Sequence, residues 1–379
     1  MVERLPSPYG GMITITLVTE KTLTYKNPIT QKISTRIKPN HKKYLNTHPM
    51  DFRGIVKGLH HVTATVNDAQ EDYQFYTHLL GLRLIKETVN FDNERVYHFY
   101  YANETGLPST VFTTFPYKDQ GIRKGVVGYG QVYETAFSVP SGALPFWRKR
   151  LKEHGVEVKE ETRFDQPYLL FEDPSGLKLS ILEDGADARE PVWTSGGVDR
   201  EHAIPGVHHV TLAVDDSEET LAFVEAFGYR KVRTDGVRTL LEAFGTGSGA
   251  DGEKPVESLA GNALVVMKAD GLPRGMNGLG TVHHVAHRVA KPDDSLRIKA
   301  WLEEEHGIRV TEIMDRKYFK SIYFRIPGGV LFEVATEGPG FLVDESREEL
   351  GSSLKLPDWQ EPRRQLIEAN LKPYKQAGP

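Results

Sequence analysis

A nine-residue pattern of alternating apolar and polar residues recurs along the chain. It reads GLHHVTATV at 58–66, GVHHVTLAV at 206–214 and TVHHVAHRV at 281–289, with a weaker fourth copy, QVYETAFSV, at 131–139. Alternation with a period of two residues predicts a strand with one buried face. The second residue of each central pair falls at positions 61, 134, 209 and 284, which are 73, 75 and 75 residues apart. This even spacing indicates four copies of one structural module.

Each copy of the pattern is followed by a segment whose apolar residues have the spacing of an amphipathic helix. The predicted helices are Ala69–Leu80, Ala143–His154, Ser217–Phe227 and Asp294–His306. A glycine follows each one, and glycine readily adopts the left-handed conformation that ends many helices. Runs rich in strand-forming residues come next, as in 96–101, 168–172 and 323–326. Each module therefore has the predicted order β-α-β-β-β.

One such module leaves a sheet with an apolar face and exposed edges, so the modules should pair. Paired sheets of three or four strands curve into an open cup, and the cup is the natural ligand site. We expect an α+β fold in which four βαβββ modules pair into two domains with open cup-shaped sheets. The predicted segments are a weakly ordered basic extension (1–53), a first domain with modules 1 and 2 (54–195), a second domain with modules 3 and 4 (202–345), and a tail with a short helix (346–379).

The composition narrows the chemistry. The 379-residue chain has no cysteine, which excludes disulfides, thiol nucleophiles, iron–sulfur clusters and thiolate zinc sites. A metal ion would therefore be held by nitrogen and oxygen atoms. The formal net charge of -5 gives no broad basic surface for nucleic acid, and no apolar run reaches the roughly 18 residues of a membrane helix. We expect a cytoplasmic protein without nucleic-acid or membrane partners.

Charge is unevenly distributed at the beginning of the chain. The first 50 residues carry eight Lys or Arg against two Asp or Glu. The segment lacks the apolar stretch and small-residue cleavage site of a secretory signal. We expect a weakly ordered extension, or a natural start at Met50.

Histidine offers the first candidate chemistry, because the repeated pattern carries His61, His209 and His284 at the same position. A single strand histidine is more often a hydrogen-bonded core residue than a metal ligand, and common ancestry alone could preserve the repeat. An independent carboxylate is therefore needed before a metal site is inferred.

Module 4 supplies that carboxylate as Glu333, in the strand-like run VLFEVATE, where module 2 has Ser180. A buried carboxylate costs several kcal/mol unless it is paired, protonated or metal-bound. A salt bridge to Arg325 or Arg316 is the structural alternative. Two histidines and one glutamate form the facial set that leaves open positions on iron(II).

Further polar residues surround this set in the sequence. Arg316 and Tyr323 precede Glu333, and a guanidinium and a phenol could hold an anionic substrate and assist proton transfer. His60, His208 and His283 each precede a candidate ligand. Since neighbouring strand residues point to opposite faces, these three reach the cavity only if the strand is bulged or if both faces border it. Otherwise they are packing residues.

The motifs resemble those of the vicinal oxygen chelate superfamily, and more narrowly its hydroquinone-type ring-cleaving dioxygenases, a group that includes chlorohydroquinone dioxygenase. The likeness runs from about Gly54 to Tyr374, through GLHHVT, TVHHVAHRV, DRKYFKSIYFRIPGGVLFEVATEGPGF and LPDWQEPRRQLIEANL. The last two segments are much more specific than the histidine pairs.

The resemblance implies three iron(II) ligands, His61, His284 and Glu333, in a pocket lined by Arg316 and Tyr323. It further implies that His60 and His283 lie next to these ligands without binding the metal themselves, and that module 1 pairs with module 4. The implied reaction opens a substituted or unsubstituted hydroquinone with O2. The partners would be a small aromatic substrate and O2, and a homo-oligomer is allowed.

Other readings stay open at this point. A catechol-type extradiol enzyme would take its ligands from modules 3 and 4, as His209, His284 and Glu333, and the repeat alone does not choose between His61 and His209. A glyoxalase-like isomerase usually needs a second acidic ligand, and modules 1 to 3 have no equivalent of Glu333. A protein that binds a small aromatic without catalysis is the third alternative.

Overall fold

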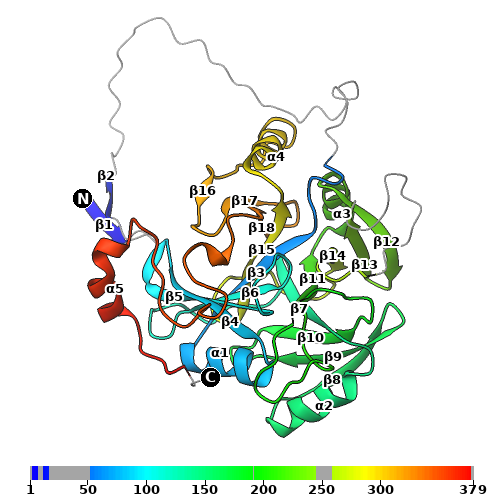
Figure 1. Ribbon diagram of the computed structural model, residues 1–379. Helices are drawn as coiled ribbons and strands as arrows, with labels where there is room; N and C mark the ends of the chain where they lie inside the picture. Colours follow the sequence, from blue (N-terminus) through cyan, green and yellow to red (C-terminus); the bar gives the residue numbers. More distant parts are fainter. Residues whose placement is uncertain (1, 7–11, 17–51, 191, 245–257, 377–379) are drawn as a thin grey trace, which may run out of the picture. The chain divides into compact units, whose positions relative to one another are not determined.

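The computed structural model describes residues 2–6, 12–16, 52–190, 192–244 and 258–376. The chain divides into two compact units, Met1–Pro49 and Met50–Pro379. In the first unit, β1 (Val2–Pro6) and β2 (Met12–Thr16) form an antiparallel pair. Most of the predicted basic extension lies outside the described residues. The second unit holds the four modules (Figure 1).

The second unit contains two curved eight-stranded sheets, which we call the first cup and the second cup. The first cup has the strand order β16-β17-β18-β15-β3-β6-β5-β4. Its strands are β3 (Leu59–Val66), β4 (Arg83–Asn90), β5 (Asn93–Ala102), β6 (Val111–Pro116), β15 (Thr281–Val289), β16 (Met314–Asp315), β17 (Lys320–Arg325) and β18 (Leu331–Thr336).

The second cup has the strand order β12-β13-β14-β11-β7-β10-β9-β8. Its strands are β7 (Gln131–Val139), β8 (Lys159–Arg163), β9 (Gln166–Glu172), β10 (Lys178–Glu183), β11 (Val207–Val214), β12 (Tyr229–Asp235), β13 (Arg238–Ala243) and β14 (Ala263–Lys268). The predicted α+β fold of paired modules with cup-shaped sheets is confirmed.

Each cup is built from modules that are not in the same half of the sequence. In the first cup β3 of module 1 pairs with β15 of module 4, and in the second cup β7 of module 2 pairs with β11 of module 3; both pairs are antiparallel. The predicted domains at 54–195 and 202–345 follow the order of modules along the chain, whereas hydrogen bonding across the sheets joins the two halves. The domain boundaries themselves stay a prediction.

The four module helices lie close to their predicted positions. They are α1 (Ala69–Gln74), continued by a π-helical turn η1 (Phe75–Leu79), then α2 (Leu144–Glu153), α3 (Ser217–Ala226) and α4 (Pro292–Glu304). The glycines predicted to end them all have positive φ, from +64° at Gly307 to +114° at Gly228. Within the described part of the chain, no helix is both long and apolar enough to cross a membrane.

The tail after module 4 returns to the first cup. It contains the short 3-10 turns η2 (Phe341–Val343) and η3 (Glu361–Arg363) and the helix α5 (Arg364–Asn370). Phe341 and Leu350 join a buried cluster with Tyr100 and Tyr318. Ile367 of α5 packs with residues of β4 and the tail in another small cluster. The tail therefore covers part of the first cup and its β4 edge.

Alternation along the central strands gives the first cup two different faces. Val62, Val285 and Val334 belong to one large buried cluster that also contains Ile298 and Trp301 of α4. These valines therefore face the helices. Successive strand residues point to opposite faces, so the residues just before or after them in the chain face the concave side. Those chain neighbours are His61, His284 and Glu333.

Candidate metal centre

The strand register of the first cup brings the three predicted ligands to one place. Ala286 of β15 pairs with Glu333 of β18 on one side and with His61 of β3 on the other. His284 lies two residues before Ala286, on the same face of β15. Two ligands from module 4 thus meet one from module 1, although more than 200 residues separate them in the sequence.

The ligand atoms of these side chains converge. His284 Nε2 lies 2.8 Å from Glu333 Oε2, and His61 Nε2 lies 3.3 Å from the same oxygen. The two Nε2 atoms are 3.4 Å apart. The exposed fractions are 2% for His61, 6% for His284 and 0% for Glu333. Among the described residues, this is the one group of three His, Asp or Glu whose ligand atoms lie within 4.8 Å of one another.

The carboxylate of Glu333 lacks conventional partners. Within the described residues, neither of its buried oxygens has a hydrogen-bond partner, so the short contacts to the imidazoles lack hydrogen-bond geometry. Burial acts to raise the pKa of Glu333, but the His61 and His284 rings hold it well below its usual range. A buried, charged carboxylate beside two imidazole nitrogens fits a metal ion that prefers nitrogen and oxygen ligands, and iron(II) is one such ion.

The alternative salt bridges of Glu333 are absent from the described contacts. Arg325 donates from Nη1 to the carbonyl of Gly329 at 2.7 Å and is exposed. Arg316 donates to Asp92 at 3.0 Å and to Tyr323 at 3.2 Å. Both guanidiniums are thus engaged elsewhere, and the geometry favours a bound metal ion as the compensating charge.

Each candidate histidine ligand has its chain neighbour beside it because of a β-bulge. The pairing of β3 with β15 shifts at His60 and again at His283, so each is an extra residue in its strand. His60 Nδ1 lies 2.9 Å from His61 Nδ1, and His283 Nδ1 lies 2.8 Å from His284 Nδ1. The bulge is thus the feature that lets His60 and His283 turn toward the ligand rings.

The protonation of these pairs follows from metal chemistry. An imidazole that offers Nε2 to a metal carries its proton on Nδ1, so His61 and His284 would donate to their neighbours. Burial first, and the adjacent histidine second, lower the pKa of both His60 and His283 to about 3. Both neighbours therefore stay neutral and can accept these hydrogen bonds at physiological pH.

Tyr323 and Arg316 lie beside the same cluster. Tyr323 of β17 pairs with Glu333 of β18, and its ring centroid is 5.6 Å from that of His284. Burial, and then the nearby Glu333, raise the pKa of Tyr323, so its phenol stays protonated. Arg316 Nε donates to the Tyr323 hydroxyl at 3.2 Å. The pair combines a proton donor with a fixed positive charge.

Sequence reasoning missed His98, which lies on β5 of module 1. Its pKa is lowered well below the usual value by burial first, then by His61 and His284. Its ring centroid is 4.0 Å from that of Tyr100 and 4.3 Å from that of Phe115. No other module repeats this histidine, so the repeat gave no signal. The alternation of His98 and Tyr100 in one strand was the available clue.

The second cup holds His209 in a different environment. The residues at the His284 and Glu333 positions are Glu134 and Ser180. Glu134 Oε1 accepts hydrogen bonds from Arg163 Nη1 and from Ser180 Oγ, both at 2.7 Å. Glu134 keeps the pKa of Arg163 above its usual value against the opposing effect of burial. His209 therefore lies near the buried ion pair of Arg163 and Glu134. It belongs to a different sheet from His284 and Glu333.

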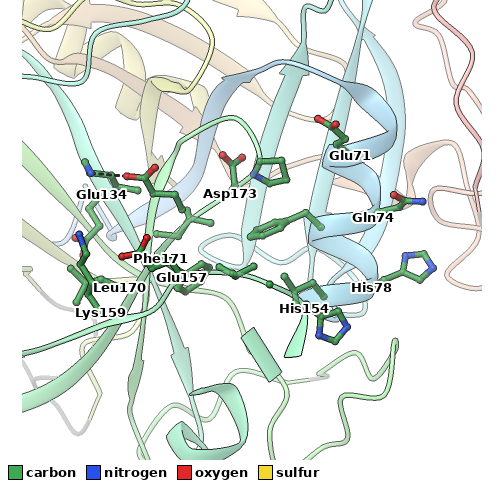
Figure 2. A pocket seen from close by; sticks show the side chains of 18 of the residues that line it. Glu71, Gln74, His78, Glu134, His154, Glu157, Lys159, Leu170, Phe171 and Asp173 are labelled. Carbon is green, nitrogen blue, oxygen red and sulfur yellow. Dashed lines mark hydrogen bonds and ion pairs between the residues drawn. The ribbon is translucent and has the colours of Figure 1, made fainter. Parts of the chain in front are cut away.

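A large cavity of about 1250 Å³ lies apart from the histidine cluster. Figure 2 shows Gln74 and His78 from the first module helix on one side of it, and Glu134, Lys159 and Leu170 from the second cup on the other. The lining includes neither His61, His284 nor Glu333. Among the described residues, the lining of this cavity contains no group of three converging ligand atoms, so the donor atoms and not the cavity size locate the candidate site.

Known proteins share this architecture. A sequence profile of the Glyoxalase/Bleomycin resistance protein/Dioxygenase superfamily matches residues 58–181 and 206–334, which cover most of the four modules. The chain belongs to this superfamily. The resemblance inferred from the motifs is thus confirmed. Both matched segments include a candidate histidine, and the second also includes Arg316, Tyr323 and Glu333.

Individual relatives of this superfamily cover most of the chain. "Putative ring-cleaving dioxygenase MhqE" of Bacillus subtilis (strain 168) is 43% identical over 82% of this chain and 97% of its own length. The "Chlorohydroquinone/hydroquinone 1,2-dioxygenase" of Sphingobium indicum is 38% identical over 79% of this chain and 91% of its own. A crystal structure described as a "putative dioxygenase" from Bacillus subtilis subsp. subtilis str. 168 matches with a TM-score of 0.77 at 39% identity, covering 84% of this chain and 98% of that one.

Proposed function

We propose that this protein is an iron(II)-dependent ring-cleaving dioxygenase that opens a hydroquinone, with or without ring substituents, using O2. The observation that carries the proposal is the convergence of His61 Nε2, His284 Nε2 and Glu333 Oε2 on the concave face of the first cup. The printed names of relatives at 38% and 43% identity, which specify ring-cleaving and hydroquinone dioxygenases, support the same reaction class.

His61, His284 and Glu333 would hold the iron and leave the remaining positions open. Iron(II) supplies electron transfer between an aromatic ring and O2, two partners that otherwise react slowly. The buried position of the three ligands keeps bulk water away from this centre. His60 and His283 would fix the orientation of the ligand rings through their Nδ1 hydrogen bonds.

Tyr323 and Arg316 would act on the substrate itself. The Tyr323 hydroxyl, held protonated by its environment, can donate a hydrogen bond or a proton to an oxygen at the centre. Arg316 can hold negative charge that develops on that oxygen, because its guanidinium is oriented by Tyr323 and by Asp92. The overall reaction would add both oxygen atoms of O2 to the ring carbons as the ring opens. The open-chain product therefore contains all the atoms of one hydroquinone and one O2.

The test is anaerobic reconstitution followed by oxygen. The purified chain is loaded with iron(II), its metal content is measured, and hydroquinone is added before O2, with zinc-loaded protein as a matched control. We expect about one iron per chain and O2 uptake with ring opening, because the donor set is one triad. An iron-loaded protein that binds hydroquinone but returns it unchanged after O2 contradicts the proposal. Isomerisation of a substrate without O2 uptake would indicate a glyoxalase-like enzyme instead.

The cytoplasmic location and the possible homo-oligomer stay predictions from the sequence. We propose a cytoplasmic enzyme whose partners are a small aromatic substrate and O2. The size of the native particle, measured by light scattering, tests for a homo-oligomer.

A further inference from the structure

We propose that His98 is a substrate-positioning residue that accepts a hydrogen bond, through Nδ1, from the hydroxyl of a hydroquinone on the far side of the ring from the metal. This inference rests on the proposed function and adds the part of the site that would distinguish a hydroquinone from a catechol or a phenol. It assigns a role to a strand of module 1 that the ligand set does not use.

The strand register places His98 on the same face as the candidate ligands. Thr63 of β3 pairs with His284 of β15 and with Thr113 of β6, and Thr113 pairs in turn with Tyr100 of β5. His98 lies two residues before Tyr100, so it shares the face of Tyr100. Because the sheet is curved, side chains on this concave face converge across the strands.

A chain of hydroxyl groups fixes which nitrogen of His98 carries the proton. Thr113 Oγ1 donates to Thr63 Oγ1 at 2.8 Å, which uses its single hydrogen. His98 Nε2 lies 2.9 Å from Thr113 Oγ1. The imidazole must therefore donate from Nε2–H, and the neutral ring keeps an acceptor lone pair on Nδ1.

That lone pair has no protein partner. Within the described residues, the sole side-chain hydrogen bond of His98 is the one from Nε2 to Thr113. The side chain is half-buried, in contrast to the fully buried Tyr100 beside it. The ring is held between the rings of Tyr100 and Phe115, which restricts its rotation. An acceptor that no described side chain uses, on a ring fixed by its packing, is a group prepared for a ligand.

The surrounding charges keep this acceptor neutral. Burial is the main cause of the lowered pKa of His98, followed by His61, His284 and Arg316, with Glu333 opposing them. These four groups belong to the candidate metal centre or lie beside it, which agrees with the strand register that places His98 on the same concave face. At neutral pH the ring therefore accepts a hydrogen bond at Nδ1 rather than donating one.

The positions of the two hydroxyls of a hydroquinone match the positions of these side chains. Tyr323 and Arg316 come from β17 and its approach, on one side of the candidate ligands, and His98 comes from β5 on the other. The two hydroxyls of a hydroquinone lie at opposite ends of its ring. One hydroxyl held near Tyr323 would direct the other toward β5, where His98 is the acceptor. A catechol has both hydroxyls at one end and would leave Nδ1 without a partner.

The experiment measures anaerobic dissociation constants of the iron-loaded protein for hydroquinone and for phenol, which lacks the second hydroxyl. In His98→Gln, the side-chain amide can still reach Thr113 but no acceptor remains at the Nδ1 position. We expect hydroquinone binding to weaken by roughly 2- to 12-fold, the range of one neutral hydrogen bond. Phenol binding and iron content should stay unchanged. His98→Asn, which places an amide oxygen near the Nδ1 position, should recover part of the preference.

A second comparison uses wild-type protein alone and so remains decisive if the variants fail to fold. In 4-methoxyphenol the far oxygen is methylated and cannot donate, so its affinity should fall to that of phenol. Equal weakening of hydroquinone and phenol in His98→Gln, or a wild-type protein without any preference for hydroquinone, overturns the inference. If hydroquinone binds with the expected preference but is never cleaved, the proposed function fails while the role of His98 stands.

Discussion

The two cups start from the same strand motif and end with different chemistry. In both, a histidine pair sits at a bulge in the central strand, with Nδ1 atoms 2.9 Å apart for His60 and His61 and 2.7 Å apart for His208 and His209. In both, one alanine pairs with a residue on each neighbouring strand. Ala286 of β15 pairs with Glu333 of β18 and with His61 of β3, and Ala136 of β7 pairs with Ser180 of β10 and with His209 of β11. The backbone framework is therefore nearly equivalent.

The difference lies in how each cup compensates a buried carboxylate. Glu134 in the second cup is neutralised by the guanidinium of Arg163, with Ser180 as a further donor. Glu333 in the first cup has two imidazoles beside it and, among the described side chains, no Lys or Arg within ion-pair distance. A buried charge needs a counter-charge. The second cup carries that counter-charge as the Arg163 guanidinium, and in the first cup a bound metal ion would have to supply it.

The largest expected effect comes from exchanging equivalent histidines for alanine. His61→Ala should lower metal content from about one per chain to near zero and abolish O2 uptake, since a ligand contributes more than the roughly 10- to 100-fold of a supporting group. His209→Ala, equally buried in the second cup, should keep both. Metal analysis by plasma mass spectrometry checks the pair. The opposite outcome would assign the metal to modules 3 and 4.

The ion pair of the second cup should matter for stability rather than for metal. Arg163→Met leaves Glu134 buried without a cation, which should lower the free energy of unfolding by about 3–5 kcal/mol. The double variant Arg163→Met, Glu134→Leu should recover most of that loss, because paired apolar side chains need no counter-charge. Urea denaturation measures both, and iron content should be unchanged. Unaltered stability of the single variant would contradict a buried, uncompensated Glu134.

Substitution of His60 and of His208, which precede the paired histidines of the two cups, should differ in its effect on metal affinity, but less than substitution of His61 and His209. His60→Ala removes the acceptor for His61 Nδ1 and should weaken metal affinity by roughly 10- to 100-fold. His208→Ala removes the equivalent group of the second cup and should leave metal affinity unchanged. Competition with a chelator of known affinity measures the change. Equal effects of the two substitutions would show that the contact at His60 only stabilises the fold.

The smallest effect, taken per pH unit, concerns the module helices, where module 1 has Asp72 and module 3 has Thr220 at the equivalent position. Asp72 accepts from Tyr101 and Thr114, and burial raises its pKa to about 8. The folded chain then keeps a proton that the unfolded chain loses above about pH 4. Stability therefore falls as pH rises from about 4 to 8, by at most about 1.4 kcal/mol per pH unit for one proton.

Asp72→Asn should remove this slope, because an amide does not titrate. Urea denaturation at several pH values between 4 and 8 tests the prediction, with Asp173→Asn, a change at another buried carboxyl whose pKa is raised, as a comparison. A variant with the same pH dependence as the wild type would show that Asp72 is already ionised in the folded chain.

Much of the local structure could be predicted from the sequence. The helix that begins at Ala69 was predicted as one segment to Leu80, and the structure adds a detail: its second half is the π-helical turn Phe75–Leu79. The hydroxyl of Thr77 donates to the carbonyl of Tyr73, a contact that competes with regular helical bonding. Periodicity predicts that a helix forms, but it does not report such local competition.

The candidate site was predictable in its residue types and less so in its supporting groups. Glu333 could be singled out because a carboxylate in an apolar strand requires compensation. The contact of His60 with His61 depended on a bulge, which shows in the register between strands rather than in one strand's sequence. His98 has no repeated counterpart in the other modules. Its position on the same face as the candidate ligands follows only from the pairing of β5 with β6 and of β6 with β3.

The sequence by itself determined four modules, the order of their elements, and two imidazoles and a carboxylate as the available ligands, because periodicity and residue type are local properties of a chain. The tertiary structure decided that module 1 pairs with module 4, so that His61 rather than His209 meets His284 and Glu333. Strand edges from any two modules could pair by backbone hydrogen bonds alone. Burial of their apolar faces against distant parts of the chain selects the partner, and that selection is made only when the whole chain folds.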